Sequence, residues 1–527
     1  MNSNETKKKV IIIGAGVSGM ACASYLLDNN YDVEIYEKHN ITGGECTAWT
    51  RKGVEIDGCA HWIIGVDKYS DFYPVWTHVG AFDENTKIEF SDYFTKFKFD
   101  DGDIVTVYAN ITRLEEELLR VAPEDKRRIK GFIRAIKAYQ HVAVPVKKPL
   151  RHMNIFELTK FGLGFLPMAP YYIRYKHMSS KEYASRFKNP KLRYIFEHVC
   201  ASTYNVHSFF YIMHALTLHD AGVIEGGSLQ FAKNMENNVL SKGGKIFTNS
   251  EISKILVDND NKVIGIRLKN GEEKLSDYVV ASADVHHVLY DLLENKYTED
   301  YFKKRFEDYE TYPLNTAVLV VYKITKDISD KARMMVVDAH DLYIGPEKID
   351  RLSMRNHSYT KKDDNEPTTV SLLIPVQDEV YDYFKKFNTK KDYLEAKRQV
   401  GLSVKEYVKD YFELNDDELE LIDVTTPLTY ERYLNAYRGS YMSYISTKNG
   451  KGLMRSGVVK GLKNFILTGQ WLMSPGGLPI AVFTGKHAAY EICHQDKKKF
   501  ICKEKKYPEL SLKKKRKLYS KKNTTEW

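Results

Sequence analysis

The sequence predicts an α/β fold with a mixed sheet and many helices, and three separated stretches carry that prediction. Lys9 to Gly44 alternates strand, glycine turn, helix and strand. Gly243 to Asp284 contains three strand-like runs joined by Asn-Asp and Asn-Gly turns. Asn464 to Cys493 repeats the opening order, with a strand, a glycine turn and a helix that begins near Pro479. We expect these pieces to pack into one domain, with an α+β region interleaved between them.

The first stretch is typical of a Rossmann-like dinucleotide-binding unit. The β-branched run Val10 to Ile13 leads directly into Gly14, Gly16 and Gly19. The first glycine permits the tight turn, the second lets a pyrophosphate approach the backbone, and the third lets helix pack closely on strand. The helix N-terminus offers unpaired N–H groups to the phosphates. Glu37 lies 23 residues after Gly14, where an acid can accept hydrogen bonds from an adenosine ribose.

Length and composition set limits on the class of protein. A chain of 527 residues exceeds what one hydrophobic core usually supports, so we expect two or more domains. Hydrophobic content of 43% and charged content of 28% are ordinary for a globular protein. No run of about 18 uncharged apolar residues occurs, which argues against a spanning helix. The first ten residues leave no room for a secretory signal, so we expect a cytoplasmic protein.

The residues that usually carry metal or nucleophile chemistry are not arranged for it. The six cysteines are scattered without CxxC spacing, which argues against a zinc site and against a disulfide framework. The sequence also has no HExxH motif, no catalytic triad and no paired carboxylates at a telling spacing. We therefore expect no metal in the chemistry of this protein.

The C-terminal tail carries the excess charge of the chain. Residues 496–527 hold 13 Lys and Arg against 4 Asp and Glu, while the rest of the chain is balanced. A segment this polar is expected to be a disordered, solvated extension. Basic residues near anionic lipid also favour peripheral contact with a membrane surface, with Phe500, Ile501, Leu512, Leu518 and Trp527 as weak apolar anchors. Nucleic acid is the less favoured partner.

Between the glycine units, local patterns predict the remaining elements. Tyr93 to Tyr108 alternates around an Asp-Asp-Gly-Asp turn and predicts a hairpin. Ile111 to Val144 has the three- and four-residue spacing of amphipathic helices. Ile155 to Tyr175 is the most apolar and aromatic segment. It could be a buried helix pair, the lining of an apolar cavity, or a segment at a membrane surface.

Together the three glycine stretches resemble the amine-oxidase-like flavoproteins, and in particular the flavin-dependent carotenoid desaturases, carotene isomerases and retinol saturases. The resemblance covers Lys9 to about Ile492. It implies FAD as cofactor, with the backbone of Ile252 offered to the adenine and the stretch Gly469 to Leu478 closing over the ribityl chain and flavin. It implies that FAD contacts Gly14, Ala15, Gly16, Ser18, Gly19, Glu37, Lys38, Gly43, Gly44, Glu45, Arg51, His61, Ile252, Gly469, Gln470, Gly477 and Leu478.

The same resemblance implies a discontinuous domain organisation. We expect an FAD-binding domain from residues 1–70, 222–290 and 455–495, a substrate or lid domain from 71–221 and 291–454, and the tail at 496–527. Two positions depart from the pattern. Glu45 stands where related proteins often carry Arg, so phosphate neutralisation would pass to Arg51 or to the backbone. Gln470 stands where many relatives have Asp, which leaves a neutral acceptor for the ribityl hydroxyls.

The function implied is an FAD-dependent oxidoreductase that desaturates, saturates or isomerises carbon–carbon double bonds of a long apolar molecule such as a carotenoid or retinoid. His61 is the one titratable side chain expected at the flavin, either as an acid or proton relay or as a hydrogen-bonded core residue. Trp62 and Tyr204 are expected as wall residues. The alternatives are a fatty-acid double-bond isomerase, an amine oxidase, which should place an aromatic pair at the flavin, and a non-catalytic prenyl-binding chaperone of the GDP-dissociation-inhibitor type.

Overall fold

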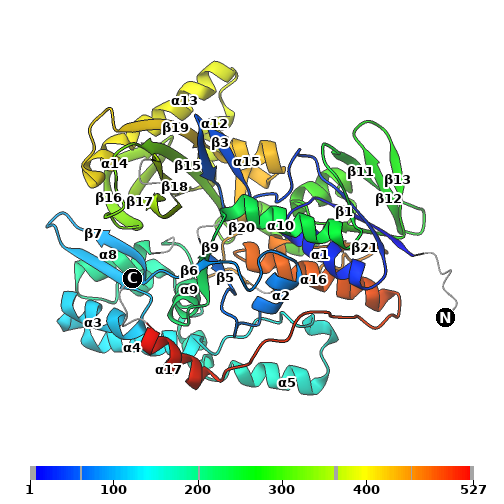
Figure 1. The fold of residues 1–527 in the computed structure, drawn as a ribbon, viewed down its shortest axis with the longest axis horizontal. Helices are drawn as coiled ribbons and strands as arrows, with labels where there is room; N and C mark the ends of the chain where they lie inside the picture. The colour runs from blue at the N-terminus through cyan, green and yellow to red at the C-terminus, as the bar shows by residue number, and fades with distance from the viewer. Residues whose placement is uncertain (1–6, 60–61, 200–201, 361–365, 453, 523–527) are drawn as a thin grey trace.

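The computed structural model describes residues 7–59, 62–199, 202–360, 366–452 and 454–522 (Figure 1). One half of the molecule is built on a five-stranded parallel sheet. The strand order is β10 (Lys245–Phe247), β2 (Asp32–Tyr36), β1 (Lys9–Ile13), β14 (Tyr278–Ala281) and β21 (Phe465–Leu467). Four separated parts of the chain thus supply neighbouring strands. Strand β14 is fully buried and β1 buries every residue except Lys9, because parallel strands are covered on both faces.

Alternate residues of β1 belong to two different cores, as the two-residue period of a strand requires. Val10 and Ile12 pack into the cluster formed with α1 (Val17–Asp28), α10 (Gly227–Ser241) and α16 (Leu478–Gln495). Ile11 and Ile13 pack into a second cluster, on the side of the three-stranded sheet formed by β11 (Ile252–Val257), β12 (Val263–Leu268) and β13 (Glu273–Leu275).

The second half is built on an eight-stranded mixed sheet. Its order is β19 (Leu419–Thr425), β15 (Leu314–Ile324), β18 (Thr368–Val376), β17 (Glu347–Asn356), β16 (Met334–Ile344), β7 (Tyr93–Lys98) and β8 (Ile104–Tyr108), with β20 (Ser440–Tyr444) paired to β15. The predicted hairpin at Tyr93 to Tyr108 is confirmed, and β7 runs parallel to β16. The helices beside this sheet are α12 (Asp378–Lys385), α13 (Lys390–Ser403), α14 (Lys405–Phe412) and α15 (Pro427–Leu434). The predicted α/β class with a mixed sheet is confirmed.

A helical layer lies along the lower edge of the view in Figure 1. It consists of α3 (Ile111–Val121), α4 (Lys126–Tyr139), α5 (Ile155–Gly164), α6 (Ala169–Tyr175), α7 (Ser180–Ala184), α8 (Pro190–His198) and α9 (His207–Thr217). Its core is rich in aromatic rings, among them Phe132, Phe196 and Phe210, which are all buried. The small sheet β5 (Ile63–Ile64), β9 (Ala221–Ile224) and β6 (Ile88–Glu89) connects this layer to the glycine-turn half.

Two sequence expectations differ from the structure. The apolar segment Ile155 to Tyr175 forms α5 and α6, but α5 buries none of its residues, so it is not a buried helix pair. The tail is also ordered as far as Lys522 rather than disordered. It ends in α17 (Leu512–Lys522), and Tyr519 is buried where its hydroxyl donates to Asp67. Specific polar contacts with the body therefore outweigh the polar composition of the tail.

Among the described residues, no helix combines the length and the apolar content needed to cross a bilayer.

Candidate active site

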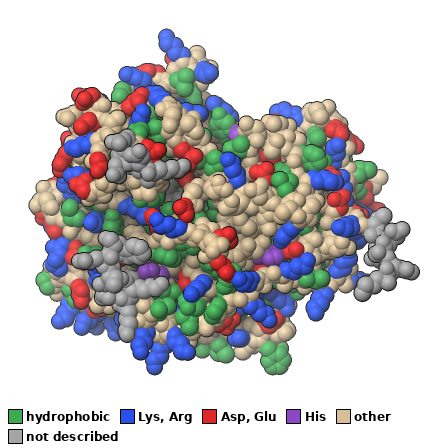
Figure 2. All heavy atoms as spheres, viewed as in Figure 1, with side chains coloured by type: hydrophobic (Ala, Val, Ile, Leu, Met, Phe, Trp, Pro, Cys, Tyr) green, Lys and Arg blue, Asp and Glu red, His purple; other side chains and the backbone are tan. Residues whose placement is uncertain are grey.

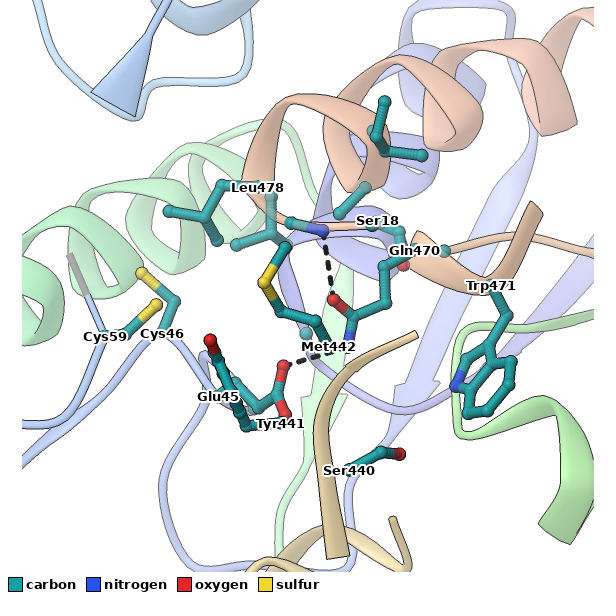
Figure 3. A pocket seen from close by; sticks show the side chains of 18 of the residues that line it. Ser18, Glu45, Cys46, Cys59, Ser440, Tyr441, Met442, Gln470, Trp471 and Leu478 are labelled. Carbon is teal, nitrogen blue, oxygen red and sulfur yellow. Dashed lines mark hydrogen bonds between the residues drawn. The ribbon is translucent and has the colours of Figure 1, made fainter. Parts of the chain in front are cut away.

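A cavity of about 740 Å³ runs between the two halves of the molecule. One end is formed by the glycine turn after β1 and by Glu37, and the other by the aromatic residues of the helical layer. Strand β20 and the segment before α16 form part of the wall between these ends (Figure 3). A space of this size and shape suits an elongated cofactor with an apolar substrate beside it.

The glycine turn leaves backbone donors open at the end of the cavity. Gly14 has a φ of 93°, a conformation that side-chain-bearing residues rarely adopt. Gly16 is the N-cap of α1 and offers no side chain to the free N–H groups of the first turn. A Cβ built on Gly16 comes no closer than 4.0 Å to another residue, so packing within the protein does not require glycine there. The space is left for a ligand.

Glu37 is held in place by two backbone groups. Its carboxylate accepts hydrogen bonds from the N–H groups of Ala15 and His39, both at 2.8 Å. The side chain is 8% exposed and lines the cavity. Lys38 also lines the cavity, where its Nζ donates to the side chain of Asn435, and burial lowers its pKa. Ile252 follows Ser250 and Glu251 in the wall next to Glu37.

The second glycine pair closes against the first turn. The Gly43 N–H donates to the Ala15 carbonyl at 2.9 Å, and a Cβ at Gly43 would lie 2.3 Å from the Cys46 carbonyl oxygen. Gly44 also lines the cavity. Gly19 does not line it but lies behind the turn, where a Cβ would come within 2.3 Å of the Gly14 oxygen. Its role is the close packing of helix on strand.

Glu45 and Gln470 form a half-buried pair in the wall of the cavity (Figure 3). Gln470 Nε2 donates to Glu45 at 2.9 Å, and Gln470 Oε1 accepts from the Gly477 N–H at 3.1 Å. Both polar atoms of Gln470 are therefore engaged by protein. Burial raises the pKa of Glu45 to about 8, so its carboxyl is largely protonated at neutral pH.

The start of α16 brings a second helix N-terminus to the cavity. Gly477 is its N-cap, without a side-chain cap, and Leu478 lines the wall. Gly469 has a φ of 118° and faces Ser18 across the wall, with a Cβ position 3.5 Å from Ser18 Oγ. The N-termini of α1 and α16 thus both direct partial positive charge into one cavity, as a ligand with a pyrophosphate and a second electron-rich part would require.

Of the predicted contact residues, Arg51 lies elsewhere. Its side chain is about half exposed and its Nε is 3.7 Å from Asp423, away from the cavity. The expectation that Arg51 neutralises phosphate is wrong in this structure, because strand β3 (Ala48–Arg51) turns it toward the large sheet. Ala15 acts only through its backbone, while His61 lies outside the described residues.

Several cavity residues were not predicted from the sequence. Tyr430 and Tyr441 form an aromatic pair in the cavity wall, with ring centroids 6.2 Å apart. Cys46 and Cys59 lie side by side in Figure 3, and their hydrogen bond, followed by burial, holds the pKa of Cys59 well above its usual value. Arg355 enters from β17. The expected wall residues Trp62 and Tyr204 do line the cavity.

Among the described residues, one group could hold a metal ion by the spacing of its ligand atoms: Asp100, Asp338 and His340. It lies outside the cavity lining.

The comparisons with known proteins agree with this geometry. The family model described as flavin containing amine oxidoreductase matches residues 17–493. The phytoene desaturase (neurosporene-forming) of Rhodobacter capsulatus is 25% identical over 308 residues, which is 56% of this chain and 56% of that protein. The chain thus spans about half the length of the curated relatives it matches.

Solved structures show the same fold. An oxidoreductase from Methanosarcina mazei matches with a TM-score of 0.57 and 16% identity, over 91% of this chain and 99% of that one. Cyclohexylamine oxidase from Brevibacterium oxydans matches with a TM-score of 0.56 and 14% identity, over 94% and 100% of the two chains. With its open glycine turn, its fixed Glu37 and two uncapped helix N-termini on one cavity, this chain belongs to the family of flavin-containing amine oxidoreductases, and its cofactor is FAD.

Proposed function

We propose that the chain is an FAD-dependent oxidoreductase that acts on carbon–carbon bonds of a long apolar molecule, with desaturation of a carotenoid-like polyene as the leading reaction. The observation that carries the proposal is the continuous cavity, which leads from the dinucleotide turn to a wall of apolar and aromatic side chains: Trp62, Val142, Met168, Ile212, Leu373 and Met442. The names of the phytoene desaturases among its relatives support the same substrate class.

The protein positions the substrate, excludes water from the cavity and controls the transfer of protons. Bound flavin supplies acceptance or return of a hydride. The apolar wall aligns a substrate that has few polar groups to recognise. Glu45, protonated near neutral pH, can hold or release a proton inside the cavity. His61 remains a proposed second proton relay. Saturation would use the same residues and return a hydride to the substrate, whereas isomerisation would involve no net hydride transfer.

The test is flavin reduction by a polyene. Purified protein should show the flavin absorbance bands, and under anaerobic conditions detergent-dispersed phytoene should bleach them. Gly14→Val combined with Gly16→Val should remove the flavin, because the added side chains occupy the turn where the pyrophosphate approaches. The control is Gly162→Val on helix α5, where the backbone is helical and nothing lies within 4 Å of the added Cβ. Wild-type protein that stays colourless after incubation with FAD contradicts the proposal.

A second candidate substrate class is an apolar molecule that carries an acid group, as a fatty-acid double-bond isomerase would require. Arg355 favours it. This guanidinium lines the cavity, and within the described part of the chain its Nη1 is buried without a hydrogen-bond partner. Burial lowers the pKa of Arg355 to about 10, so it remains charged at neutral pH. A buried guanidinium N–H without a partner is costly, and a substrate carboxylate would satisfy it with paired hydrogen bonds. The positive charge of Arg355 would also repel a protonated amine substrate.

The two classes are separated by the Arg355→Met variant, which removes the charge and keeps much of the volume. If the substrate is an acid, the affinity for a polyunsaturated fatty acid, measured by perturbation of the flavin spectrum, should fall about 100-fold. If the substrate is a hydrocarbon polyene, phytoene binding should be unchanged or improved. Lys386→Met, on the exposed side of the large sheet's helices, is the control.

A further inference from the structure

The strongest unexplained feature is an apolar surface on the helical layer. In the described part of the chain, 17 large hydrophobic side chains are exposed, and seven of them lie between residues 155 and 173. We call these seven the apolar patch: Ile155, Phe156, Leu158, Leu163, Leu166, Tyr172 and Ile173. Phe156 is 82% exposed and Ile173 is 67% exposed. Concentration of this kind on one segment is the mark of an interaction surface, not of scattered surface residues.

Helix α5 is built in a way that leaves this surface unpartnered. Its start is fixed by a capping box, in which Asn154 accepts from the Glu157 N–H at 2.9 Å and Glu157 accepts from the Asn154 N–H at 2.7 Å. The helix is therefore well formed at its N-terminus, although it buries no residue. Ten-residue helices are marginal in water without tertiary packing. An exposed α5 is thus expected to gain its packing from something outside the chain.

A cluster of arginines lies next to the patch. Arg127, Arg128, Arg134, Arg174 and Arg186 line a cavity of about 400 Å³, whose other walls are the rings of Tyr175, Tyr183 and Phe187. Arg128 alone among the five has a carboxylate partner in the described residues, Asp125 at 3.3 Å. Five guanidinium groups around a small cavity repel one another unless an anion enters, and their planar forks match a phosphate.

The arginine cavity and the apolar patch are joined by α6. Ile173 belongs to the patch and its neighbour Arg174 to the cavity, so this one helix carries both kinds of side chain. In Figure 2 hydrophobic side chains protrude at the lower edge of the molecule, where Figure 1 shows α5, and Lys and Arg side chains gather along the same edge beneath α4 and α17. An apolar face bordered by cations is the pattern of a helix that lies in the headgroup region of an anionic bilayer.

The active-site cavity opens at the same place. Tyr172 is 48% exposed as a patch residue, yet it also lines the large cavity together with Met168. Because Tyr172 belongs to both, we place the mouth of the cavity within the patch. A substrate of low water solubility could pass from lipid into the cavity without crossing water.

We propose that α5, α6 and the arginine cavity form one docking surface for an anionic lipid bilayer, with the arginines recognising lipid phosphate. The proposal rests on the proposed function, because docking brings the mouth of the cavity to the lipid from which an apolar substrate would enter. It places the main membrane contact on the helical layer, while the basic tail contributes charge from the same edge of the molecule.

The test is co-sedimentation of FAD-loaded, full-length protein with vesicles of phosphatidylcholine alone or mixed with phosphatidylglycerol. Ile155→Ser with Phe156→Ser should weaken binding to the mixed vesicles at least about tenfold, since two inserted side chains are lost. The matched control is Leu394→Ser with Leu402→Ser on α13, at the opposite edge in Figure 1 and also exposed, at 48% and 37%. Equal binding by the patch variant and its control overturns the proposal.

Charge recognition is tested in the same way. Arg127→Gln with Arg174→Gln should remove most of the preference for phosphatidylglycerol, since each basic residue contributes roughly a factor of five at an anionic surface. The control is Lys391→Gln with Arg398→Gln on α13, which should change the preference little. Calorimetry with inorganic phosphate separates the two sources of the anion. If phosphate binds in a manner that depends on the arginines while vesicles of either composition do not bind, the cavity serves a soluble ligand and the membrane proposal fails.

Two further measurements complete the test. Sedimentation velocity of the free protein should give a monomer for both the wild type and the patch variant. A wild-type dimer that the patch variant dissociates would assign the patch to a second copy and overturn the proposal. Flavin absorbance is read on every sample. Protein that keeps its flavin and reacts with detergent-dispersed polyene, but ignores vesicles, contradicts the docking surface alone, whereas vesicle binding by protein without flavin contradicts the proposed function alone.

Discussion

Glu37 shows how a single residue links the chain's turn to its cofactor. It fixes the turn through the Ala15 and His39 N–H groups and presents its carboxylate to the cavity. Glu37→Ala should weaken FAD binding about 100-fold, because hydrogen bonds to a charged group contribute about 1.5–3 kcal/mol. Quenching of FAD fluorescence on titration into the apoprotein measures this. Glu55→Ala, at an exposed position on the strand Val54–Asp57, is the control, and equal affinity of the two variants would contradict the role of Glu37.

Glu45 gives a prediction about pH. Its pKa in the folded apoprotein, about 8, lies above the ordinary value of 4.5 because burial disfavours the charged form. The unfolded chain therefore releases this proton first as pH rises. The stability that depends on the neutral carboxyl is fully present below pH 4.5 and is lost between pH 4.5 and 8, by up to about 1.4 kcal/mol per pH unit.

Glu45→Gln should remove that dependence, since the amide stays neutral. Thermal unfolding of the apoprotein at pH 5.5 and 7.5 should therefore show a stability gain over wild type that is larger at the higher pH. Glu55→Gln, which changes an exposed carboxylate, should show no such difference. A parallel pH dependence in wild type and Glu45→Gln would mean that Glu45 is not the buried acid.

The position of Arg355 in the cavity could not be predicted from its sequence neighbours. Strand β17 alternates buried and exposed residues, and a charged residue in such a run is normally solvated. Only the approach of β17 to the strand of Tyr441 and to the loop of Cys59 turns Arg355 into a cavity residue. The sequence held no local signal for that approach.

At the scale of elements, the packing of α1 against α16 fixes the geometry of the cofactor site. Gly485 of α16 lies so close to α1 that a Cβ would stand 2.3 Å from the Ser18 carbonyl oxygen and 2.9 Å from Ala21 Cβ. Gly485→Ala should push the helices apart, lower stability by about 1–3 kcal/mol and weaken FAD binding, because α1 carries the open turn. Gly162→Ala on α5, with nothing within 4 Å, is the control. Equal melting temperatures for the two variants would contradict this packing.

The elements that sequence patterns predicted well are those with local signals. The first two strands and the start of α16 are marked by β-branched runs and glycine turns, and the structure places them close to the predicted residues. Helices α5 and α6 show the limit of such reasoning. An apolar, aromatic run predicts a helix, but whether that helix is buried depends on which other elements cover it, and no element in the described part of the chain buries a residue of α5.

At the scale of the whole molecule, the tail packs against the cofactor-binding half. Asp496 accepts hydrogen bonds from the hydroxyls of Tyr31 and Tyr278, at 2.7 and 2.6 Å, and Asn29 holds the backbone of Ile501 at 2.7 Å. Composition alone predicted disorder, because it counts the lysines of the tail but not the few acids that find buried partners. The ordering of residues 496–511 therefore depends on individual contacts.

The decisive contact is the ion pair between Lys486 of α16 and Glu504 of the tail. Their Nζ and Oε1 atoms are 2.5 Å apart, with side chains 3% and 15% exposed, and the Tyr25 hydroxyl donates to the same carboxylate. Removing one partner leaves a buried charge, so Glu504→Gln should cost about 3–5 kcal/mol in the free energy of unfolding.

Lys486→Met combined with Glu504→Gln should recover most of that loss, because the uncompensated charge is removed while the amide still accepts from Tyr25. Lys505→Gln, in the exposed pair with Glu84, should change the stability little, because solvent screens this pair. Urea unfolding measures all three, and limited proteolysis reports whether the tail is released. If Glu504→Gln costs no more than Lys505→Gln and the tail stays resistant to protease, the ion pair does not hold the tail, and its order must come from α17 and the Tyr519 contact with Asp67.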